Sequence, residues 1–167
     1  MLNKKICMLG ASGVGKTSLV KKFVDGIFSE KYLTTIGVKV DKKVVETAND
    51  KVQFMLWDIE GTDRYCGFNP RYLRGAAAYL VVVDKTRSQS LIDGDEIRKL
   101  AEEVTDSPAL LILNKSDLEP MFTLDDPQIK QLEQHFIATI ETSAKTGKNV
   151  EYAFHCLAEH LICSSES

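Results

Sequence analysis

Short apolar runs alternate along this chain with longer stretches in which apolar residues recur every three or four positions. Three runs, Lys5–Leu9, Tyr79–Val83 and Ala109–Leu113, are apolar at nearly every position, which is typical of strands buried on both faces of a parallel sheet. A shorter last strand is expected at Ile137–Ile140. The stretches between these runs predict helices near Lys16–Asp25, Ser88–Val104, Asp126–His135 and Val150–Ile162. This alternation indicates a mostly parallel sheet.

A different pattern marks the segments Val38–Glu46 and Val52–Trp57, which flank a short turn at residues 48–50. In the second segment, Val52, Phe54 and Leu56 occupy alternate positions, and this period of two predicts a β-hairpin. Because hairpin strands are antiparallel, one edge strand of the otherwise parallel sheet should be reversed.

Length and composition fit one globular domain over residues 1–167. Apolar residues make up 44% of the chain, and the net charge of −3 gives no reason to expect nucleic acid, which usually needs a basic face. The longest apolar run, Ala76–Val83, is too short to cross a bilayer, and Lys4 and Lys5 interrupt any N-terminal signal peptide. The cysteines show no metal-binding spacing, which favours a reduced, cytoplasmic protein; they are Cys7, Cys66, Cys156 and Cys163.

The segment Gly10–Thr17 fits the phosphate-binding pattern G-x-x-x-x-G-K-[ST] between an expected strand and an expected helix. Backbone N–H groups of such a loop, together with the helix N-terminus, point at phosphates. Lys16 would reach the β- and γ-phosphates, and the Thr17 hydroxyl would ligate Mg²⁺. By average residue usage the pattern arises by chance about once in a hundred chains of this length, so a glycine-rich turn that binds nothing is a weak alternative. The expected nucleotide-binding residues here are Gly13, Val14, Gly15, Lys16, Thr17 and Ser18.

Two further motifs follow expected strands, and the carboxyl ends of strands are where ligands bind in open α/β sheets. Asp58 ends the strand Val52–Trp57, as does the Walker-B aspartate that holds Mg²⁺; a turn or helix-cap aspartate is the alternative. Asn114-Lys115-Ser116-Asp117 follows the strand Ala109–Leu113. The Asp117 carboxylate can accept hydrogen bonds from N1–H and the exocyclic amine of guanine, a pair of donors that adenine lacks. An Asx turn is the alternative for this tetrapeptide.

Taken together, these motifs give the chain a resemblance to small GTPases of the Ras superfamily over nearly its entire length. The segments Thr35–Val38 and Tyr72–Ala76 look most like the Rab branch. The resemblance implies a three-layer P-loop NTPase sandwich with a six-stranded, mostly parallel sheet, one antiparallel edge strand and about five helices. It also implies a molecular switch that binds GTP and GDP with Mg²⁺ and hydrolyses GTP.

The family assigns roles to matching positions. The metal ligands are expected to be Thr17 and Thr35, with Asp58 acting through water, and the amides of Thr35 and Gly61 sense the γ-phosphate. Phe28 would pack edge-on against guanine, Lys115 would lie along it, and the Ala144 backbone would contact its carbonyl. The remaining base-binding positions are Asn114, Asp117, Ser143 and Lys145. Without the other motifs, Phe28 would be interpreted as a loop residue packed on the core, and 143–145 as an ordinary turn.

The main departure from the family pattern is Thr62, which stands where a glutamine usually orients the attacking water. The expected catalytic positions are therefore Lys16, Thr35, Gly61 and the altered Thr62. We expect turnover at or below the ~10⁻⁴ s⁻¹ of unassisted members. A non-hydrolysing GTP-binding module is the main alternative, and a P-loop kinase or ATPase is disfavoured by Asn114–Asp117.

The resemblance also implies partners. Switch loops near residues 28–37 and 60–73 would be ordered by γ-phosphate and Mg²⁺ and contacted by an effector, an exchange factor and an activating protein. We expect a monomer. The residues from Cys163 to Ser167 match neither C-a-a-X nor a paired-cysteine tail, so no lipidation motif is visible.

Overall fold

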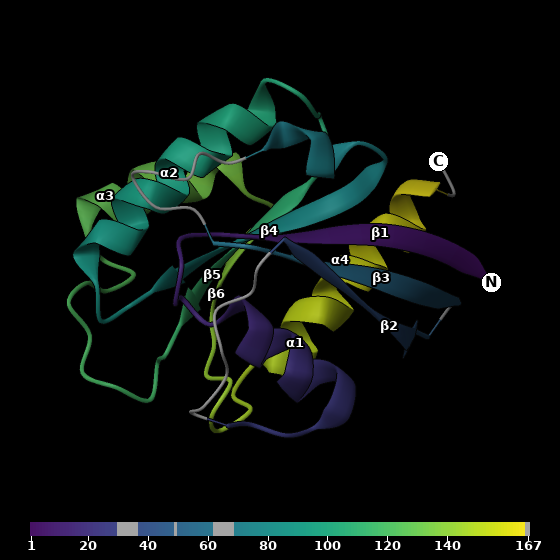
Figure 1. Cartoon of the computed structure of the whole chain (residues 1–167), viewed down its shortest axis with the longest axis horizontal. Coiled ribbons are helices and arrows are strands. Elements are labelled where there is room, and N and C mark those ends of the chain that lie inside the picture. Colours follow the sequence, from purple (N-terminus) through teal and green to yellow (C-terminus); the bar gives the residue numbers. More distant parts are fainter. Residues whose placement is uncertain (30–36, 49, 62–68, 166–167) are drawn as a thin grey trace.

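A six-stranded sheet runs through the centre of the computed structural model, which describes residues 1–29, 37–48, 50–61 and 69–165. The strands lie in the order β2-β3-β1-β4-β5-β6 (Figure 1). Their bounds are β1 (Leu2–Leu9), β2 (Val38–Glu46), β3 (Lys51–Ile59), β4 (Ala76–Asp84), β5 (Ala109–Asn114) and β6 (Ala138–Glu141). The helices are α1 (Lys16–Asp25), α2 (Ser88–Glu102), α3 (Pro127–Leu132) and α4 (Val150–Ser165), with 3₁₀ turns η1 (Pro70–Leu73) and η2 (Glu133–His135).

The pairing of the strands confirms the predicted mixed sheet. Strand β2 runs antiparallel to β3, with Val45 opposite Val52, and the other neighbouring pairs are parallel. Strand β2 has the predicted bounds, and β6 is shifted by one residue from the predicted Ile137–Ile140, whereas the other four strands are longer than predicted. Strand β1, for example, begins at Leu2, and its exposed first residues still pair with β3. Hydropathy marks only the buried part of a strand, whereas the backbone ladder continues into solvent.

The side chains of the central strands pack alternately into two separate cores, because successive residues of a strand point to opposite faces. Ile6 and Met8 of β1 join the core covered by α1 and α4, while Cys7 and Leu9 join the core covered by α2 and α3. Figure 1 shows the two helix pairs on opposite faces of the sheet. The result is the three-layer α/β sandwich expected from the sequence.

The α1–α4 layer is held together by an aromatic pair. Phe23 of α1 stacks on Phe154 of α4 with ring centroids 4.0 Å apart and the ring planes 10° from parallel. Both side chains are almost fully buried. Aromatic pairs of this kind contribute about 1 kcal/mol beyond their burial, so this contact fixes α1, and with it the preceding loop, against the sheet.

The helices differ in detail from the expected count of about five. The described residues contain four α-helices and two 3₁₀ turns. The segment expected to be one helix near Asp126–His135 divides into α3 and η2, and α2 ends at Glu102 rather than at Val104. None of the helices in the described part of the chain has the length and apolar character that a membrane span requires.

Candidate nucleotide-binding site

The polar motifs predicted from the sequence meet at one edge of the sheet, because the carboxyl ends of parallel strands lie together. The loop Gly10–Lys16 follows β1, and Asp58 lies at the end of β3. Asn114 is the last residue of β5, and Thr142 and Ser143 follow β6. Residues that are more than a hundred positions apart in the chain thus face one another.

The loop after β1 approaches β5 so closely that Gly15 has no room for a side chain. Asn114 donates from Nδ2 to the Val14 carbonyl at 3.0 Å, and a Cβ on Gly15 would lie 2.2 Å from the same nitrogen. Gly15 also has a φ of 103°, which side-chain-bearing residues rarely adopt. The second glycine of the motif is therefore required by both conformation and contact.

Lys16 is the buried cation of this loop, with only 6% of its surface exposed. Its Nζ donates to the carbonyls of Gly10 at 3.2 Å and Ala11 at 2.9 Å. Burial lowers the pKa of Lys16 to about 8; Asp58 opposes this shift, and the nearby Arg87 adds to it. A cation held at this cost in desolvation favours an anionic ligand at the loop.

Thr17 and Asp58 form the pair expected to hold Mg²⁺. The Thr17 hydroxyl donates to Asp58 Oδ2 at 2.6 Å, and Asp58 is 1% exposed. A hydroxyl and a carboxylate are hard oxygen ligands, and Mg²⁺ at nucleotide sites characteristically takes one or two protein ligands together with phosphates and water. These residues therefore fit Mg²⁺. Thr35, the other expected ligand, lies outside the described residues.

The chain beyond Asp58 passes directly against the phosphate loop. A Cβ on Gly61 would lie 2.3 Å from the Cα of Ser12, so only glycine allows this approach. Glu60 accepts a hydrogen bond at Oε2 from the Gly37 amide (3.1 Å) and donates its own amide to the Gly37 carbonyl (2.8 Å). These bonds join the ends of the two expected switch segments. Thr62 lies outside the described residues.

At the other end of the site, the expected base-binding residues are joined by side-chain hydrogen bonds. Ser143 donates from Oγ to Asp117 Oδ1 at 2.7 Å, which fixes the orientation of that exposed carboxylate. Thr142 donates from Oγ1 to Asn114 Oδ1 at 3.0 Å, so the Asn114 amide links the loop after β6 to the phosphate loop. Lys115 donates to the Gly13 carbonyl at 3.0 Å.

The remaining expected positions lie nearby with less specific contacts. Ala144 is buried and Lys145 is exposed in the turn after Ser143. Ser18 is half-buried in the first turn of α1, whereas Val14 is fully buried. Phe28 is partly buried and packs against the core under α1 and α4. That contact agrees with the alternative interpretation of Phe28, and its role at the base remains a prediction.

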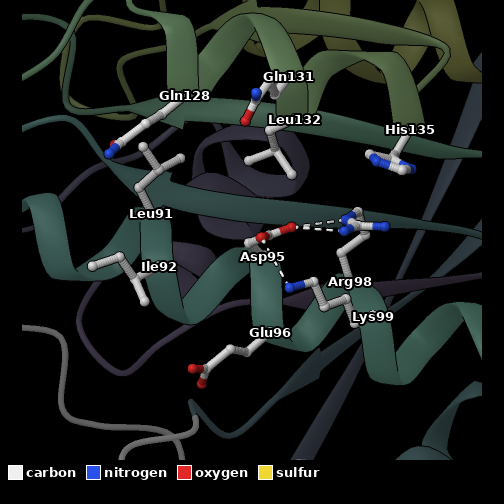
Figure 2. A pocket seen from close by; sticks show the side chains of 10 residues that line it. All are labelled: Leu91, Ile92, Asp95, Glu96, Arg98, Lys99, Gln128, Gln131, Leu132 and His135. Atoms are coloured by element: carbon white, nitrogen blue, oxygen red, sulfur yellow. Dashed lines mark hydrogen bonds and ion pairs between the residues drawn. The ribbon is translucent and has the colours of Figure 1, made fainter.

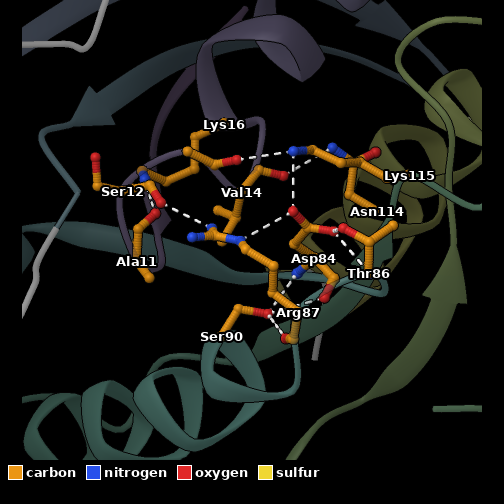
Figure 3. A network of polar contacts seen from close by, with 11 residues as sticks. Ala11, Ser12, Val14, Lys16, Asp84, Thr86, Arg87, Ser90, Asn114 and Lys115 are labelled. Atoms are coloured by element: carbon orange, nitrogen blue, oxygen red, sulfur yellow. Dashed lines mark hydrogen bonds and ion pairs between the residues drawn. The ribbon is translucent and has the colours of Figure 1, made fainter. Parts of the chain in front are cut away.

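Sequence reasoning missed a second buried carboxylate, Asp84 at the end of β4, and its partner Arg87 (Figure 3). Lys115 Nζ lies 2.9 Å from Asp84 Oδ2, and Thr86 donates to Oδ1 from both its amide and its hydroxyl. Burial opposes ionisation, but the hydrogen bonds from Thr86 and Lys115 outweigh it and hold the pKa of Asp84 below its ordinary value. The missed signal is the position of Asp84 directly after an apolar strand, which is also the position of Asp58.

A separate hollow of about 390 Å³ lies between α2 and the α3–η2 segment (Figure 2). Within its lining, Arg98 forms an ion pair with Asp95 at 2.8 Å, and Arg98 also pairs at 2.8 Å with Glu102, which is not part of the lining. The hollow contains none of the residues expected to bind nucleotide. The hollow is therefore separate from the candidate nucleotide site.

Comparisons with known proteins agree with this geometry. Residues 5–163 match the model of the Ras family. The chain is 36% identical over 164 residues to the Ras-related protein Rab5 of Nicotiana tabacum, covering 96% of this chain and 82% of that protein. It is 33% identical over 164 residues to the Ras-related protein Rab-13 of Canis lupus familiaris, covering 96% and 81%. The chain therefore belongs to the Ras family of small GTPases, with a Rab-like sequence.

Proposed function

We propose that this protein is a guanine-nucleotide switch that binds GTP or GDP with Mg²⁺ and hydrolyses GTP slowly. The observation that carries the proposal is the direct linkage of the phosphate loop to the base-recognition motif. Asn114 and Lys115 hydrogen-bond the carbonyls of Val14 and Gly13, so a ligand held at Lys16 would extend toward Asp117. A nucleotide is a ligand with an anionic end for Lys16 and a base for Asp117.

At the phosphate end, Lys16 would exchange its two carbonyl partners for phosphate oxygens. Negative charge beside this buried lysine favours its protonated form, which offsets the desolvation that lowers its pKa. The N-terminus of α1 adds backbone N–H groups and a favourable helix dipole. Together, the Lys16 ammonium and these N–H groups would contact the phosphate oxygens directly and stabilise their negative charge.

Thr17 and Asp58 would hold Mg²⁺, with Thr35 as the expected third residue. When bound, Mg²⁺ neutralises the charge that develops on the phosphate oxygens during transfer. The Thr17–Asp58 hydrogen bond of 2.6 Å already places both oxygens beside the loop. Asp58 is held at the end of a buried strand, so its carboxylate needs little reorganisation to orient the metal or its water.

At the base end, Asp117 would accept the two N–H donors of the guanine edge. Ser143 orients this carboxylate, and its hydrogen bond leaves lone pairs of both carboxylate oxygens for the base. Lys115 would lie along the base, with Phe28, the Ala144 backbone and Lys145 in the supporting roles that the family implies. A base without both donors would leave part of a desolvated carboxylate unsatisfied, which costs about 1–3 kcal/mol.

Slow hydrolysis follows from the residue at position 62. Threonine is shorter than glutamine and has no carboxamide with which to hold the attacking water. Gly61 would still contribute its amide near the γ-phosphate. The same substitution supports a second candidate function, a GTP-binding module that stays loaded and is recognised by a partner.

Hydrolysis and stable loading are distinguished by one time course. The purified protein is loaded with GTP and Mg²⁺, denatured at intervals over several hours, and the released nucleotide is identified by chromatography. A switch with slow turnover converts GTP to GDP with a measurable single-exponential rate. GTP that persists unchanged would support the loaded module, and release of neither nucleotide would refute guanine-nucleotide binding.

Replacing Thr62 with glutamine tests whether water positioning limits the rate. We expect Thr62→Gln to accelerate single-turnover hydrolysis by about tenfold or more, a minimum set below the roughly 10²–10⁴-fold that a positioned acid–base group contributes. Thr62→Ser, which also lacks a carboxamide, is the matched control and should match the wild type. An unchanged or slower rate in Thr62→Gln would contradict the argument.

The expected effector, exchange factor and activating protein would act on the segments 28–37 and 60–73. The hydrogen bonds between Gly37 and Glu60 support coupling between these segments, because a change at one end displaces a backbone partner of the other. We propose a cytoplasmic monomer. A GTP-dependent partner should bind the protein loaded with a non-hydrolysable GTP analogue and be released from the GDP form.

A further inference from the structure

Arg87 lies beside the phosphate loop although none of the motifs that define the family includes it. It precedes the first residue of α2, and its guanidinium extends toward the loop that follows β1 (Figure 3). Nη2 donates to the Ser12 carbonyl at 2.8 Å, and Nε donates to Asp84 Oδ2 at 3.1 Å. The side chain therefore bridges the end of β4 and the loop, across 75 positions of sequence.

Asp84 anchors two cations that act on neighbouring peptide groups of the loop. Arg87 holds the Ser12 carbonyl, and Lys115, paired with the same Asp84 oxygen at 2.9 Å, holds the Gly13 carbonyl at 3.0 Å. Asp84 is 1% exposed and is fixed by Thr86, so this anchor is rigid. The two consecutive carbonyls are thus directed toward the β4–α2 junction.

The direction of a carbonyl determines the direction of the next N–H group, because the two are antiparallel in a planar trans peptide. The hydrogen bond from Arg87 to the Ser12 carbonyl orients the Gly13 N–H away from Arg87. In the same way, the hydrogen bond from Lys115 to the Gly13 carbonyl orients the Val14 N–H away from Lys115. N–H groups of such a loop are the donors that bind phosphate. The two cations therefore orient donors that lie on the other side of the loop.

The guanidinium also brings charge to the loop. A Cβ on Gly13 would lie 3.7 Å from Nη2, and the charge of Arg87 contributes to the lowered pKa of Lys16. Its side chain is 46% exposed, and Nη1 has no hydrogen-bond partner among the described residues. Arg87 makes no side-chain hydrogen bond that caps α2; its side chain bonds the loop at Ser12 and the end of β4 at Asp84.

We propose that Arg87 is a positioning residue of the nucleotide site, which orients the Gly13 amide and adds a permanent positive charge beside the phosphates. This inference rests on the proposed function, binding of a guanine nucleotide at the loop. It implies that Arg87 slows nucleotide dissociation through its effect on the phosphates and not through the base.

The test measures dissociation of a fluorescent GDP from the full chain in Mg²⁺ after addition of excess unlabelled GDP. Arg87→Ala should release the nucleotide about tenfold faster, the lower end of the range for a hydrogen bond to a charged group because the guanidinium is half exposed. The dissociation rate of Arg87→Lys should lie between those of the wild type and Arg87→Ala, since an ammonium reproduces the charge but not the guanidinium fork that spans Asp84 and Ser12. Lys130→Ala, an exposed lysine of α3, is the matched control and should equal the wild type.

A second readout separates positioning from general stability. The ³¹P resonance of the β-phosphate of bound GDP should shift in Arg87→Ala and not in Lys130→Ala, because only the former alters the donors around that phosphate. Unchanged dissociation and an unchanged resonance would overturn the proposal. Faster dissociation with an unchanged resonance and a lower melting temperature would also overturn it, in favour of a purely structural role.

Two further outcomes are readily assigned. If Arg87→Ala does not fold, Arg87→Gln and Arg87→Lys replace it in the comparison. The proposal would then be overturned if GDP dissociated from both variants at the wild-type rate. If the wild type itself retains no GDP, the proposed function fails together with the inference that rests on it. If the wild type retains GDP and the variants match it, only the role of Arg87 fails.

Discussion

Replacing Lys16 with methionine should stabilise the nucleotide-free protein while weakening its hold on nucleotide. The Lys16 ammonium is 6% exposed, and burial is the main reason why its pKa falls from an ordinary 10.5 to about 8. That difference corresponds to about 3 kcal/mol of unfavourable free energy for the charged form in the folded state. The methionine variant also loses the hydrogen bonds to Gly10 and Ala11, and this loss offsets about 1–2 kcal/mol of the stability gained by removing the buried charge.

The expected net gain for Lys16→Met is therefore about 1–2 kcal/mol at pH 7 in the absence of nucleotide. Its pH dependence has a definite sign. The folded pKa is lower than the unfolded one, so between pH 8 and 10.5 the unfolded chain binds more protons and the wild type gains stability as the pH rises. The methionine variant lacks this gain, so its advantage should shrink across that window.

Urea unfolding of nucleotide-free wild type and Lys16→Met, followed by circular dichroism at pH 7, 8, 9 and 10, measures the difference directly. Lys130→Met is the control for replacing an exposed lysine and should show no such trend. In parallel, GDP affinity of Lys16→Met should fall by about a hundredfold, since a charge-assisted contact is lost. A difference in stability that does not vary with pH, or a less stable variant at pH 7, would refute the reasoning.

Three other changes test the contacts around the site and the core. Gly15→Ala places a Cβ 2.2 Å from Asn114 Nδ2 at a φ of 103°, so GDP should dissociate at least about tenfold faster, and retention equal to the wild type would argue against this contact. Asn114→Ala removes the link between Val14 and Thr142 and should lower the free energy of unfolding by about 2–3 kcal/mol; a loss below 0.5 kcal/mol, about the level of a surface change, would contradict its bridging role. Phe154→Ala removes the ring that stacks on Phe23 and should lower the free energy of unfolding in urea by about 3–5 kcal/mol, with nucleotide specificity unchanged.

The fold was largely predictable because its strands are buried on both faces and its helices carry one apolar side. The strand ends were not, as β1 illustrates: Leu2 to Lys5 pair with β3 in the backbone ladder, although none of their side chains is fully buried. The division of 126–135 into α3 and η2 likewise depends on the local backbone and leaves no separate hydropathy signal.

The candidate site was predictable where the chemistry requires a fixed local spacing, as in Gly10–Thr17 and Asn114–Asp117. Arg87 was not, because its role depends on a contact with Ser12 that only the folded chain creates. Phe28 shows the opposite limit: its sequence position fits a base contact, but the described geometry packs it against the core. Spacing identifies residues that act through a local motif, whereas residues that act through tertiary contacts become evident only in the structure.

The most direct test of guanine recognition by Asp117 is a calorimetric titration of well-folded, nucleotide-free protein with GDP, inosine diphosphate and ADP in Mg²⁺. GDP should bind tightly, inosine diphosphate at least about tenfold more weakly because it lacks the exocyclic amine, and ADP more weakly still. Absence of any heat or affinity with GDP, or equal affinity for ADP, would contradict the interpretation.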